Sequence, residues 1–503
     1  MTTIDESMAT EAYEVIVVGG GIAGCFAAAT AASAGAEVVQ LERKSADEGG
    51  FIACGDAIKS PTDPKKYPGP IDMDAIVSDE AVLADGNIDR IEWWDEELSV
   101  RKVLPYDTNS NVIDRYEFGQ RLLDQAGDLG VTQHYDTVVN DVVQNGRVEG
   151  VEAIRDGEPV RYEGEVVIDT AGAQSIMQDL VEYDALDAPG GVTFEKPHYT
   201  HFGSAYREII ETEKPVEYAN AIVGKPLEEM GYIWYFPRTD RVINVGLGFQ
   251  MNKEPIALAD RLKRDLASRP EFDRAVIDEK FGKKNKLGAA LALRRPLDSM
   301  VAPGYLAAGC GAGTTHPITG KGIRGAALSG YSAGRTAAEA VADGDVSESG
   351  LWNHNYYLYV EHGEGTKLAA RDPFNVAAGS IGIPILRAMT AVLPEEELRE
   401  IVGTETKLDD LSAKLSIGLG VLKNVVSHYR SGTFEHLDVS MGELYEALSG
   451  FRTTRTYVDT YEDHYWAYPE SREDYADWLA ERNRIDEEFY DALDLDSSER
   501  KYS

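Results

Sequence analysis

The chain has 503 residues, 43% hydrophobic and 27% charged, and its 87 Asp and Glu against 49 Lys and Arg give a formal net charge of −38. This composition is that of a globular protein and excludes the disordered and fibrous classes, and the length suits two or three domains. Because so acidic a surface repels phosphates, we expect no nucleic-acid partner.

The acidic residues are spread along the whole chain, from Asp5 to Glu499. A dispersed excess of carboxylates keeps a protein hydrated where salt screens their repulsion, so we expect a halophilic host. An acidic docking surface for a cationic partner is the alternative. The first 12 residues are acidic and are expected to be disordered. Three cysteines fit a reducing cytoplasm rather than a disulfide framework.

A strand–helix–strand unit opens the chain. Residues 13–18 are an apolar run that enters a glycine turn, residues 22–34 are rich in alanine, and residues 36–41 form a second apolar run. Short apolar runs are typical of buried parallel strands, and small side chains let a helix pack closely on a sheet. We therefore predict two parallel strands joined by a helix.

A glycine motif, G-x-G-x-x-G, lies inside this unit at Gly19, Gly21 and Gly24, and Glu42 follows the second strand. In dinucleotide-binding units the first glycine permits a tight turn and the second lets the backbone approach a pyrophosphate. The third packs the helix on the strand, and the acid binds the adenosine ribose. The pattern predicts a dinucleotide site, and the acid favours FAD or NAD over NADP.

Further elements of this first part follow in order. We predict a helix over residues 115–127, a hairpin with strands 138–143 and 147–154, and a buried strand over 166–168. The last strand ends in the sequence DTAGAQS, which contains Gly172.

The pattern changes over residues 190–295, where alternating polar and apolar residues predict antiparallel strands that form a sheet over a ligand. A glycine-rich segment at 309–322 then opens a second helix. Beyond about residue 345 we expect mainly helices. The predicted fold class is α/β, a Rossmann-like FAD domain with an inserted antiparallel-sheet substrate domain and a helical C-terminal extension. The expected boundaries are 13–185 and 296–345 for the FAD domain, 186–295 for the substrate domain and 346–503 for the helical region.

The most apolar stretch, residues 374–393, is interrupted by Gly382, Pro384 and Arg387. A bilayer span needs about 18 or more apolar residues with few or no charges. We therefore expect a packed or interfacial helix pair here and no membrane span.

Several segments resemble those of the geranylgeranyl reductase family. The sequence FIACGDAI contains Cys54 and Gly55 and is similar to the family's Cys-Gly loop. The segment that begins with Tyr232, Trp234 and Phe236 resembles the family motif Y-x-W-x-F-P followed by G-x-G. The segment at 309–323 resembles the family's later glycine motif. In the wider para-hydroxybenzoate hydroxylase superfamily, DTAGAQS and this later segment correspond to FAD-binding motifs. The resemblance covers roughly residues 13–345.

The resemblance implies FAD as cofactor and reduction of isolated carbon–carbon double bonds in isoprenoid chains, such as the geranylgeranyl groups of archaeal ether phospholipids. Arg115 matches a family arginine that approaches the cofactor. The residues expected to bind FAD are Gly19, Gly21, Gly24, Glu42, Arg115, Gly172, Gly309, Gly313, Pro317, Gly320, Gly322 and Ile323. The residues expected to act at the alkene are Cys54, Gly55, Tyr232, Trp234 and Phe236.

Each of these roles has an alternative that is purely structural. Alternate residues of a strand share one face, so Tyr232, Trp234 and Phe236 would line an isoprenoid channel, or else fill an ordinary sheet core. Small buried cysteines such as Cys54 are usually inert. His316 contacts the flavin or is simply a hydrogen-bonded loop histidine.

One position departs from the family pattern: Cys310 stands where the family usually has an Asp that bonds the ribityl chain of FAD. A thiol is a weak hydrogen-bonding group, so FAD binding could be weaker or differently arranged. Electron-transfer-flavoprotein:quinone oxidoreductases have a similar Gly-Cys pair at the start of this glycine segment. The alternatives are a flavin monooxygenase, an electron carrier to quinone and a non-catalytic flavin or lipid-binding protein.

The implied partners are an isoprenoid lipid and an electron donor, either ferredoxin or a reduced nicotinamide. Such a substrate implies peripheral contact with the inner face of the cell membrane. The four cysteines of an iron–sulfur cluster are absent, and we expect no metal site.

Overall fold

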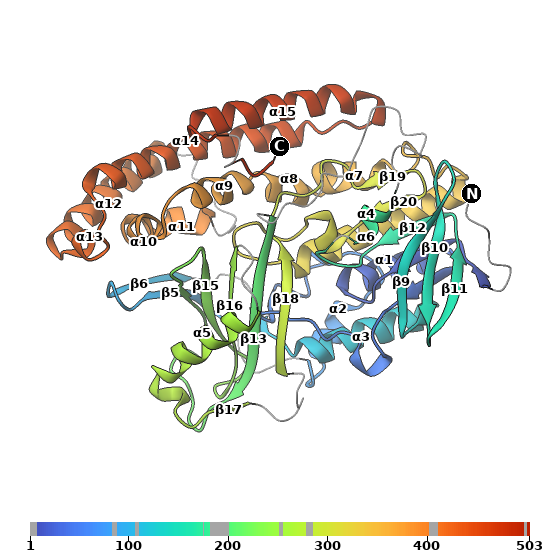
Figure 1. Ribbon diagram of the computed structural model, residues 1–503, viewed down its shortest axis with the longest axis horizontal. Coiled ribbons are helices and arrows are strands. Elements are labelled where there is room, and N and C mark those ends of the chain that lie inside the picture. Colours follow the sequence, from blue (N-terminus) through green and yellow to red (C-terminus); the bar gives the residue numbers. More distant parts are fainter. Residues whose placement is uncertain are drawn as a thin grey trace.

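The computed structural model describes residues 8–82, 88–105, 110–174, 176–181, 201–250, 255–277, 285–401, 411–496 and 500–502. In Figure 1 the α/β part with the first strands lies on the right, a large sheet lies at lower left, and the C-terminal helices run along the top. Within the described ranges no helix is long and apolar enough to cross a bilayer. The predicted fold class is confirmed.

A six-stranded sheet forms the centre of the α/β part. Its order is β19-β20-β12-β2-β3-β8, and only the β19–β20 pair is antiparallel. Strands β2 and β3 are wholly buried, which is why both are short apolar runs in the sequence. The bounds are Val15–Val18 for β2, Val38–Leu41 for β3, Thr132–His134 for β8, Val166–Asp169 for β12, Val301–Ala302 for β19 and Tyr305–Ala307 for β20.

Helix α1 (Ile22–Ser33) packs against the sheet and against two further helices, α3 (Arg115–Asp128) and α6 (Ile323–Asp343). A Cβ on Gly330 or Gly334 of α6 would overlap a backbone carbonyl oxygen of α1. Small residues on both helices therefore bring their backbones into contact. Both helices predicted in the first part are confirmed to within one residue.

A second sheet, ordered β1-β11-β10-β9, contains the predicted hairpin, which is confirmed as the antiparallel pair of β9 and β10. The disorder predicted for residues 1–12 is wrong for residues 9–12, because these form β1 and pair in parallel with β11. An open sheet edge offers unpaired backbone groups to such a segment, and composition does not reveal that edge. Residues 1–7 lie outside the described residues. The bounds are Ala9–Ala12 for β1, Thr137–Gln144 for β9, Val148–Arg155 for β10 and Glu158–Glu163 for β11.

The large sheet follows the order β17-β13-β16-β15-β14-β5-β6, and β18 also pairs with β13. Most pairs are antiparallel, as predicted, but β14 pairs in parallel with β5. Strands β5 and β6 come from residues 90–105, which the predicted division assigns to the FAD domain, because pairing between segments so far apart leaves no local signal. The bounds are Arg90–Asp95 for β5, Val100–Pro105 for β6, Phe202–Glu211 for β13, Ala221–Pro226 for β14, Gly231–Pro237 for β15, Val242–Gln250 for β16, Val276–Ile277 for β17 and Lys286–Ala292 for β18.

Smaller elements complete this half of the molecule. Helix α5 packs its buried Leu258 and Leu262 on one face of the large sheet. A short antiparallel pair, β4 with β7, follows the Cys-Gly loop and fixes its end. The bounds are Ala57–Lys59 for β4, Ser110–Val112 for β7, Met73–Ser78 for α2, Ile176–Leu180 for α4 and Pro255–Ala267 for α5.

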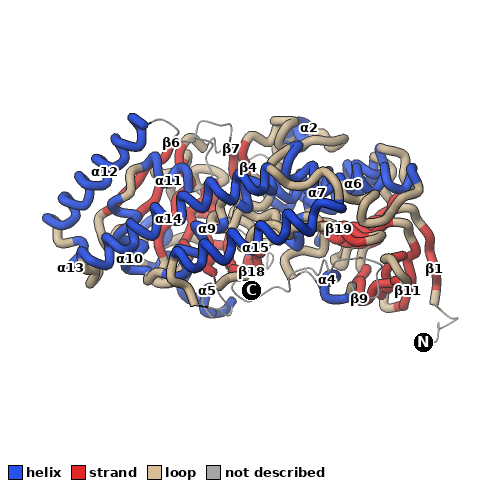
Figure 2. The backbone as a smooth tube through the Cα atoms, turned by 90° about the horizontal axis from the view of Figure 1, so that it is seen from above, coloured by secondary structure: helices blue, strands red, loops and turns tan. Residues whose placement is uncertain are grey.

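The C-terminal region is mainly helical, as predicted. The apolar stretch at 374–393 falls on two helices, α9 and α10, separated near Gly382. Figure 2 shows α14 and α15 side by side across the middle of the molecule. The bounds are Asn353–Tyr356 for α7, Glu364–Ala369 for α8, Asp372–Ser380 for α9, Ile383–Val392 for α10, Glu395–Ile401 for α11, Leu411–Arg430 for α12, Thr433–His436 for α13, Met441–Trp466 for α14 and Tyr475–Ala492 for α15.

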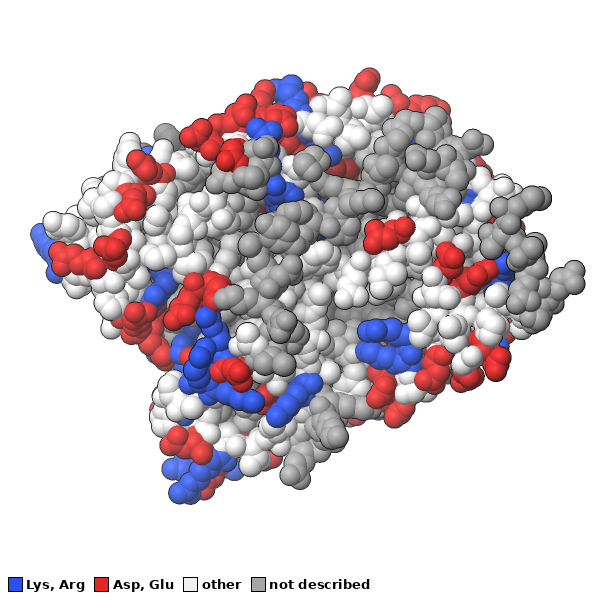
Figure 3. Space-filling model, viewed as in Figure 1, with Lys and Arg blue, Asp and Glu red and all other residues white. Residues whose placement is uncertain are grey.

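Buried polar contacts attach this region to the rest of the chain. Both terminal nitrogens of Arg295 donate to the carboxylate of Asp486 on α15, at 2.8 and 2.9 Å. Lys501 Nζ donates to Asp372 on α9 at 2.6 Å and to the carbonyl of Leu293 at 2.8 Å. The face shown in Figure 3 carries acidic side chains in several separate places, in line with their dispersion in the sequence.

Candidate active site

One large cavity, of about 1650 Å³, lies between the central sheet, the large sheet and the C-terminal helices. A site for one small ligand typically measures about 300–1000 Å³, so this cavity has room for a cofactor and a second ligand. Its wall includes the first glycine motif at one end and residues of α10 and α14 at the other. Every predicted site residue except Gly24 and Gly313 lies on that wall.

The first glycine motif forms the turn between β2 and α1. Gly19 has a φ of +115°, which favours glycine, and a Cβ on Gly24 would overlap the carbonyl oxygen of Gly19. A Cβ on Gly21 would meet no atom within 4 Å among the described residues, because this position faces the cavity. The Glu42 carboxylate accepts a hydrogen bond of 2.6 Å from the backbone N–H of Gly20, which holds it beside the turn.

Two further features fit a negatively charged dinucleotide. No side chain caps the N-terminus of α1, so its first backbone N–H groups face the cavity end uncapped. The Arg115 side chain is on the wall, is 2% exposed, and its Nη1 has no hydrogen-bond partner among the described residues. A buried guanidinium nitrogen is costly unless it binds an acceptor, so a ligand oxygen is the group expected there. Gly172, after β12, lines the same end.

The later glycine segment reaches the cavity as a loop before α6. Gly309, Gly313 and Gly320 all have φ values near +70°, and Gly322 is the N-cap of α6, which starts at Ile323. Pro317 lies on the wall, and its carbonyl accepts a hydrogen bond of 2.7 Å from Asn375 on α9. This bond ties the loop to the C-terminal helices.

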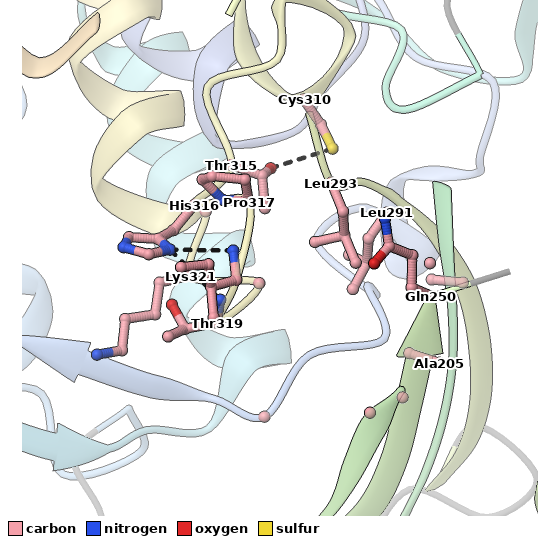
Figure 4. Close-up of a pocket in the computed structure, with 18 of the residues that line it drawn as sticks. Ala205, Gln250, Leu291, Leu293, Cys310, Thr315, His316, Pro317, Thr319 and Lys321 are labelled. Atoms are coloured by element: carbon pink, nitrogen blue, oxygen red, sulfur yellow. Dashed lines mark hydrogen bonds between the residues drawn. The ribbon is translucent and has the colours of Figure 1, made fainter. Parts of the chain in front are cut away.

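His316 occupies the same loop beside Pro317, Thr319 and Lys321, as Figure 4 shows. Its Nδ1 accepts hydrogen bonds from the backbone N–H groups of Ile318 and Thr319, at 3.2 and 3.3 Å. Burial, together with nearby positive charge, lowers the pKa of His316 to about 3. The ring is therefore neutral, and its buried Nε2 has no partner among the described residues. Nδ1 thus has an ordinary loop role.

Cys310 lies on the cavity wall at the start of the same glycine segment. Its Sγ accepts hydrogen bonds from Thr315 Oγ1 at 3.3 Å and from the backbone N–H of Ala292 on β18 at 3.4 Å, and Figure 4 shows the first of these. Burial raises the pKa of this thiol, so it stays neutral. The expected change in FAD binding stays a prediction.

A row of four aromatic rings lines the middle of the cavity. The centroids of Trp93, Tyr232, Trp234 and Phe236 follow one another at 6.5, 6.0 and 6.1 Å. Three of the rings come from β15 and Trp93 comes from β5, which is why sequence reasoning missed it. The intervening residue Tyr235 belongs instead to the core under α5. The large sheet thus turns one face of β15 to the cavity and the other to the core.

The Cys-Gly loop packs directly on this row. A Cβ on Gly55 would lie 2.6 Å from the Phe236 ring, so only glycine fits this contact. Asp56 has a φ of +66°, and its backbone N–H donates to Cys54 Sγ at 3.2 Å. Burial, and after it the charge of Asp56, raises the pKa of the Cys54 thiol.

A buried polar network fixes the loop to the sheet. Asn244 Nδ2 donates to the carbonyl of Cys54 at 2.8 Å and to the Asp56 carboxylate at 2.6 Å, while its Oδ1 accepts from Trp234 Nε1 at 2.9 Å. Arg238 bridges Asp56 and Asp114, at 2.7 and 2.9 Å. Asp114 caps α3, immediately before Arg115. Sequence reasoning missed Asn244 and Arg238, although both lie within the segment that carries the aromatic motif.

The far end of the cavity is apolar and belongs to the C-terminal helices, for which the sequence predicted no role. Its lining includes Phe374, Ile385, Met389, Leu393 and Phe451. The cavity therefore runs from a polar, glycine-lined end past an aromatic row to an apolar end.

Comparison with known proteins agrees with this arrangement. Residues 202–282 match the geranylgeranyl reductase catalytic domain, and residues 14–193 match the glucose inhibited division protein A domain. The chain is therefore similar to the geranylgeranyl reductase family. The predicted resemblance is thereby confirmed.

Curated relatives from archaea cover most of the chain. A digeranylgeranylglycerophospholipid reductase of Sulfolobus acidocaldarius is 27% identical over 72% of this chain and 76% of the relative. The protein of the same description from Methanoculleus marisnigri is 24% identical over 82% of this chain and 99% of the relative.

Solved structures share the fold of this chain. A geranylgeranyl bacteriochlorophyll reductase-like protein of Thermoplasma acidophilum has a TM-score of 0.60 and 20% identity, covering 86% of this chain and 99% of that one. A flavin-dependent brominase has a TM-score of 0.57 at 13% identity, covering 84% of this chain and all of the other. The fold is therefore shared with enzymes of different chemistry.

Proposed function

We propose that this chain is an FAD-dependent reductase that hydrogenates carbon–carbon double bonds of geranylgeranyl chains in archaeal ether lipids or a related isoprenoid. The observation that carries the proposal is the continuous cavity, which joins the glycine motifs to an aromatic row and an apolar end. The archaeal relatives, described as digeranylgeranylglycerophospholipid reductases, support the substrate class.

FAD is the cofactor. Gly19, Gly21 and Glu42 would hold its adenosine and pyrophosphate groups, and Arg115 would contact it through the guanidinium nitrogen that lacks a protein partner. The loop with Pro317 and the N-terminus of α6 would hold the flavin end. When bound and reduced, FAD supplies the hydride that an isolated alkene requires.

The chain's own residues would orient the alkene and exclude water. Trp93, Tyr232, Trp234 and Phe236 offer ring faces to an isoprenoid chain, and the Tyr232 hydroxyl is engaged with the carbonyl of Thr319 at 3.0 Å. The polar atoms of Tyr232 and Trp234 are therefore hydrogen-bonded within the protein. An isoprenoid chain that covers these side chains therefore leaves neither of the two polar atoms without a hydrogen-bond partner, and its own apolar surface is removed from water.

Cys54 is the proposed proton donor. Its raised pKa keeps the thiol protonated, and its sulfur accepts rather than donates in the bond from Asp56 N–H. The S–H proton therefore remains free for a carbon in the cavity. Gly55, pressed on Phe236, would set the position of the thiol relative to the aromatic row.

The reaction needs a reductant, for which ferredoxin and a reduced nicotinamide are the candidates. A lipid substrate would bring the protein to a membrane surface, which we propose is the inner face of the cell membrane.

The test uses the protein purified in molar salt, with its visible spectrum recorded first. We expect flavin absorption, and after chemical reduction without oxygen we expect mass spectrometry to show two added hydrogens for each double bond reduced in a geranylgeranyl lipid. The unreduced protein is the control. A protein that stays colourless with added FAD, or a reduced flavoprotein that leaves the lipid unsaturated, contradicts the proposal. Oxygen uptake with substrate and NAD(P)H would instead favour a monooxygenase.

A further inference from the structure

Helix α12 (Leu411–Arg430) differs in charge from the rest of the chain. Of the 503 residues 87 are acidic, yet the 20 residues of α12 contain no Asp or Glu and include Lys414, Lys423 and Arg430. In Figures 1 and 2 this helix lies at the end of the molecule opposite the N-terminus. Helices α1 and α10 also lack Asp and Glu, but α1 is buried in the core, whereas the second half of α12 exposes its side chains.

The outer face of α12 is apolar with a basic edge. Leu422, Val426 and Tyr429 follow one another at helical spacing and are 61%, 42% and 62% exposed. Lys423 and Arg430 are exposed one position further round the helix. This combination of an apolar stripe and basic residues is typical of helices that lie in the interface of a lipid bilayer.

The same end carries exposed apolar side chains on the first turns of α14. Met441 is 43% exposed and Tyr445 is 73% exposed, the largest fraction among the exposed large hydrophobic residues of the described chain. We call Leu422, Lys423, Val426, Tyr429, Arg430, Met441 and Tyr445 the α12 surface. Single exposed apolar residues are ordinary, but a group at one end of a molecule marks an interaction site.

The cavity reaches this end of the molecule. Glu443 and Glu446 of α14 are exposed and also line the cavity, so the apolar far end opens close to Tyr445. Helix α12 packs beside it on α10, where Asn424 Nδ2 donates to the carbonyl of Val392 at 2.9 Å. The neighbouring Leu393 is on the cavity wall.

We propose that the α12 surface docks on a lipid bilayer that contains anionic lipids, so that an isoprenoid chain passes from the membrane into the apolar end of the cavity. The occupant is a bilayer because the surface joins an apolar stripe to basic groups and lies beside the end of the cavity that Met389, Leu393 and Phe451 line. Lys423 and Arg430 on α12 would attract anionic headgroups, although Glu435, Asp438, Glu443 and Glu446 are also exposed at this end, so the attraction is confined to the α12 face. This inference rests on the proposed function, which supplies the reason for lipid uptake.

The experiment measures flotation of the full-length holoprotein with vesicles of phosphatidylcholine and phosphatidylglycerol, and with vesicles of phosphatidylcholine alone. We expect the triple variant Leu422→Ser, Val426→Ser, Tyr429→Ser to bind mixed vesicles at least about tenfold more weakly than the parent. The variant Lys423→Glu, Arg430→Glu should lose the preference for anionic vesicles. The matched control is Ile154→Ser with Val276→Ser, two exposed apolar residues on other elements, which should bind like the parent.

A second measurement does not depend on loss of binding. In the variant Tyr429→Trp, brominated lipids should quench fluorescence more than in the parent, because the new indole enters the interface. Reduction of a geranylgeranyl lipid dispersed in detergent should continue in the triple variant, so failure of docking is distinguishable from failure of the proposed function. The proposal is overturned if the parent does not float, or if the triple variant floats equally well. It is also overturned if the triple substitution only converts a dimer to a monomer.

Discussion

Asn244 is the residue on which the proposed catalytic loop depends most. Its amide makes three hydrogen bonds, to Cys54, Asp56 and Trp234, and the side chain is fully buried. A single side chain thus fixes the Cys-Gly loop against the aromatic row.

We expect Asn244→Leu to lower the free energy of unfolding by at least about 2 kcal/mol, because Trp234 Nε1 and the carbonyl of Cys54 lose their partners. Activity should also fall at temperatures where the variant is folded. Denaturant unfolding and the lipid-reduction assay measure these effects. The control is Asn424→Leu, which loses one bond to Val392, should cost about 1 kcal/mol, and should leave turnover in detergent unchanged. Equal behaviour of the two variants would contradict the role given to Asn244.

Cys54 carries the proposed proton transfer. We expect Cys54→Ala to lower the reduction rate by roughly 100-fold, since general-acid catalysis contributes about 10²–10⁴-fold. Cys25→Ala is the control, because Cys25 is buried in α1 and off the cavity wall. A Cys54→Ala enzyme as fast as the Cys25→Ala enzyme would leave water as the proton source.

The raised pKa of Cys54 also predicts a pH dependence. The thiol in the folded protein keeps its proton above the ordinary thiol pKa, so the rate should stay level through mildly alkaline pH. In the unfolded chain the thiol ionises first, so its contribution to stability is present at neutral pH and is lost as the pH rises.

At the scale of elements, the contact of α1 with α6 depends on glycine. We expect Gly330→Ala to destabilise the protein by about 1–3 kcal/mol, because the added Cβ overlaps the Ala23 carbonyl oxygen. Gly450→Ala in α14 is the matched helix control, since its Cβ would meet nothing within 4 Å. The control should raise the free energy of unfolding by about 0.5–1 kcal/mol. Thermal unfolding should therefore show a lower melting temperature for Gly330→Ala and a higher one for Gly450→Ala.

The elements also show where prediction from sequence ended. The strands and helices that were predicted in the first part agree with the structure to within a few residues, because their signals are local: apolar runs, alanine-rich spacing and glycine turns. Shorter elements of the same part, such as α2, β8 and β11, were not predicted. The pairing of β5 with β14 and of β1 with β11 was missed, because each joins segments more than 100 residues apart. Trp93 entered the aromatic row only through that pairing.

At the scale of the whole molecule, a buried charge pair between Arg295 and Asp486 helps to attach the C-terminal helices. Asp486 binds Arg295 through both oxygens and also contacts Tyr461 and Arg482. Asp486→Ala should lower the free energy of unfolding by about 3–5 kcal/mol, because it leaves the buried guanidinium of Arg295 without its carboxylate. Limited proteolysis should then cut α15 faster. Glu481→Ala, which breaks an exposed ion pair on the same helix, should change neither the free energy of unfolding nor the rate of proteolysis.

The overall charge predicts salt dependence. At a net charge of −38, repulsion among carboxylates opposes folding until salt screens it. We expect the unfolding temperature to rise steadily from low to molar KCl, while an uncharged osmolyte at matched osmolality should have a smaller effect. A protein equally stable at low salt would argue against a halophilic host, which stays a prediction.

The sequence by itself determined the dinucleotide unit, the α/β fold class and the resemblance to the geranylgeranyl reductase family, because each depends on short contiguous motifs such as Gly19 to Gly24 and Tyr232 to Phe236. The tertiary structure alone decided how these motifs meet. It placed Arg238 and Asn244 behind Cys54, brought Trp93 into the aromatic row, and put the C-terminal helices around the apolar end of the cavity. Contacts between distant segments arise from packing and long-range strand pairing, which produce no periodic pattern in the amino-acid sequence.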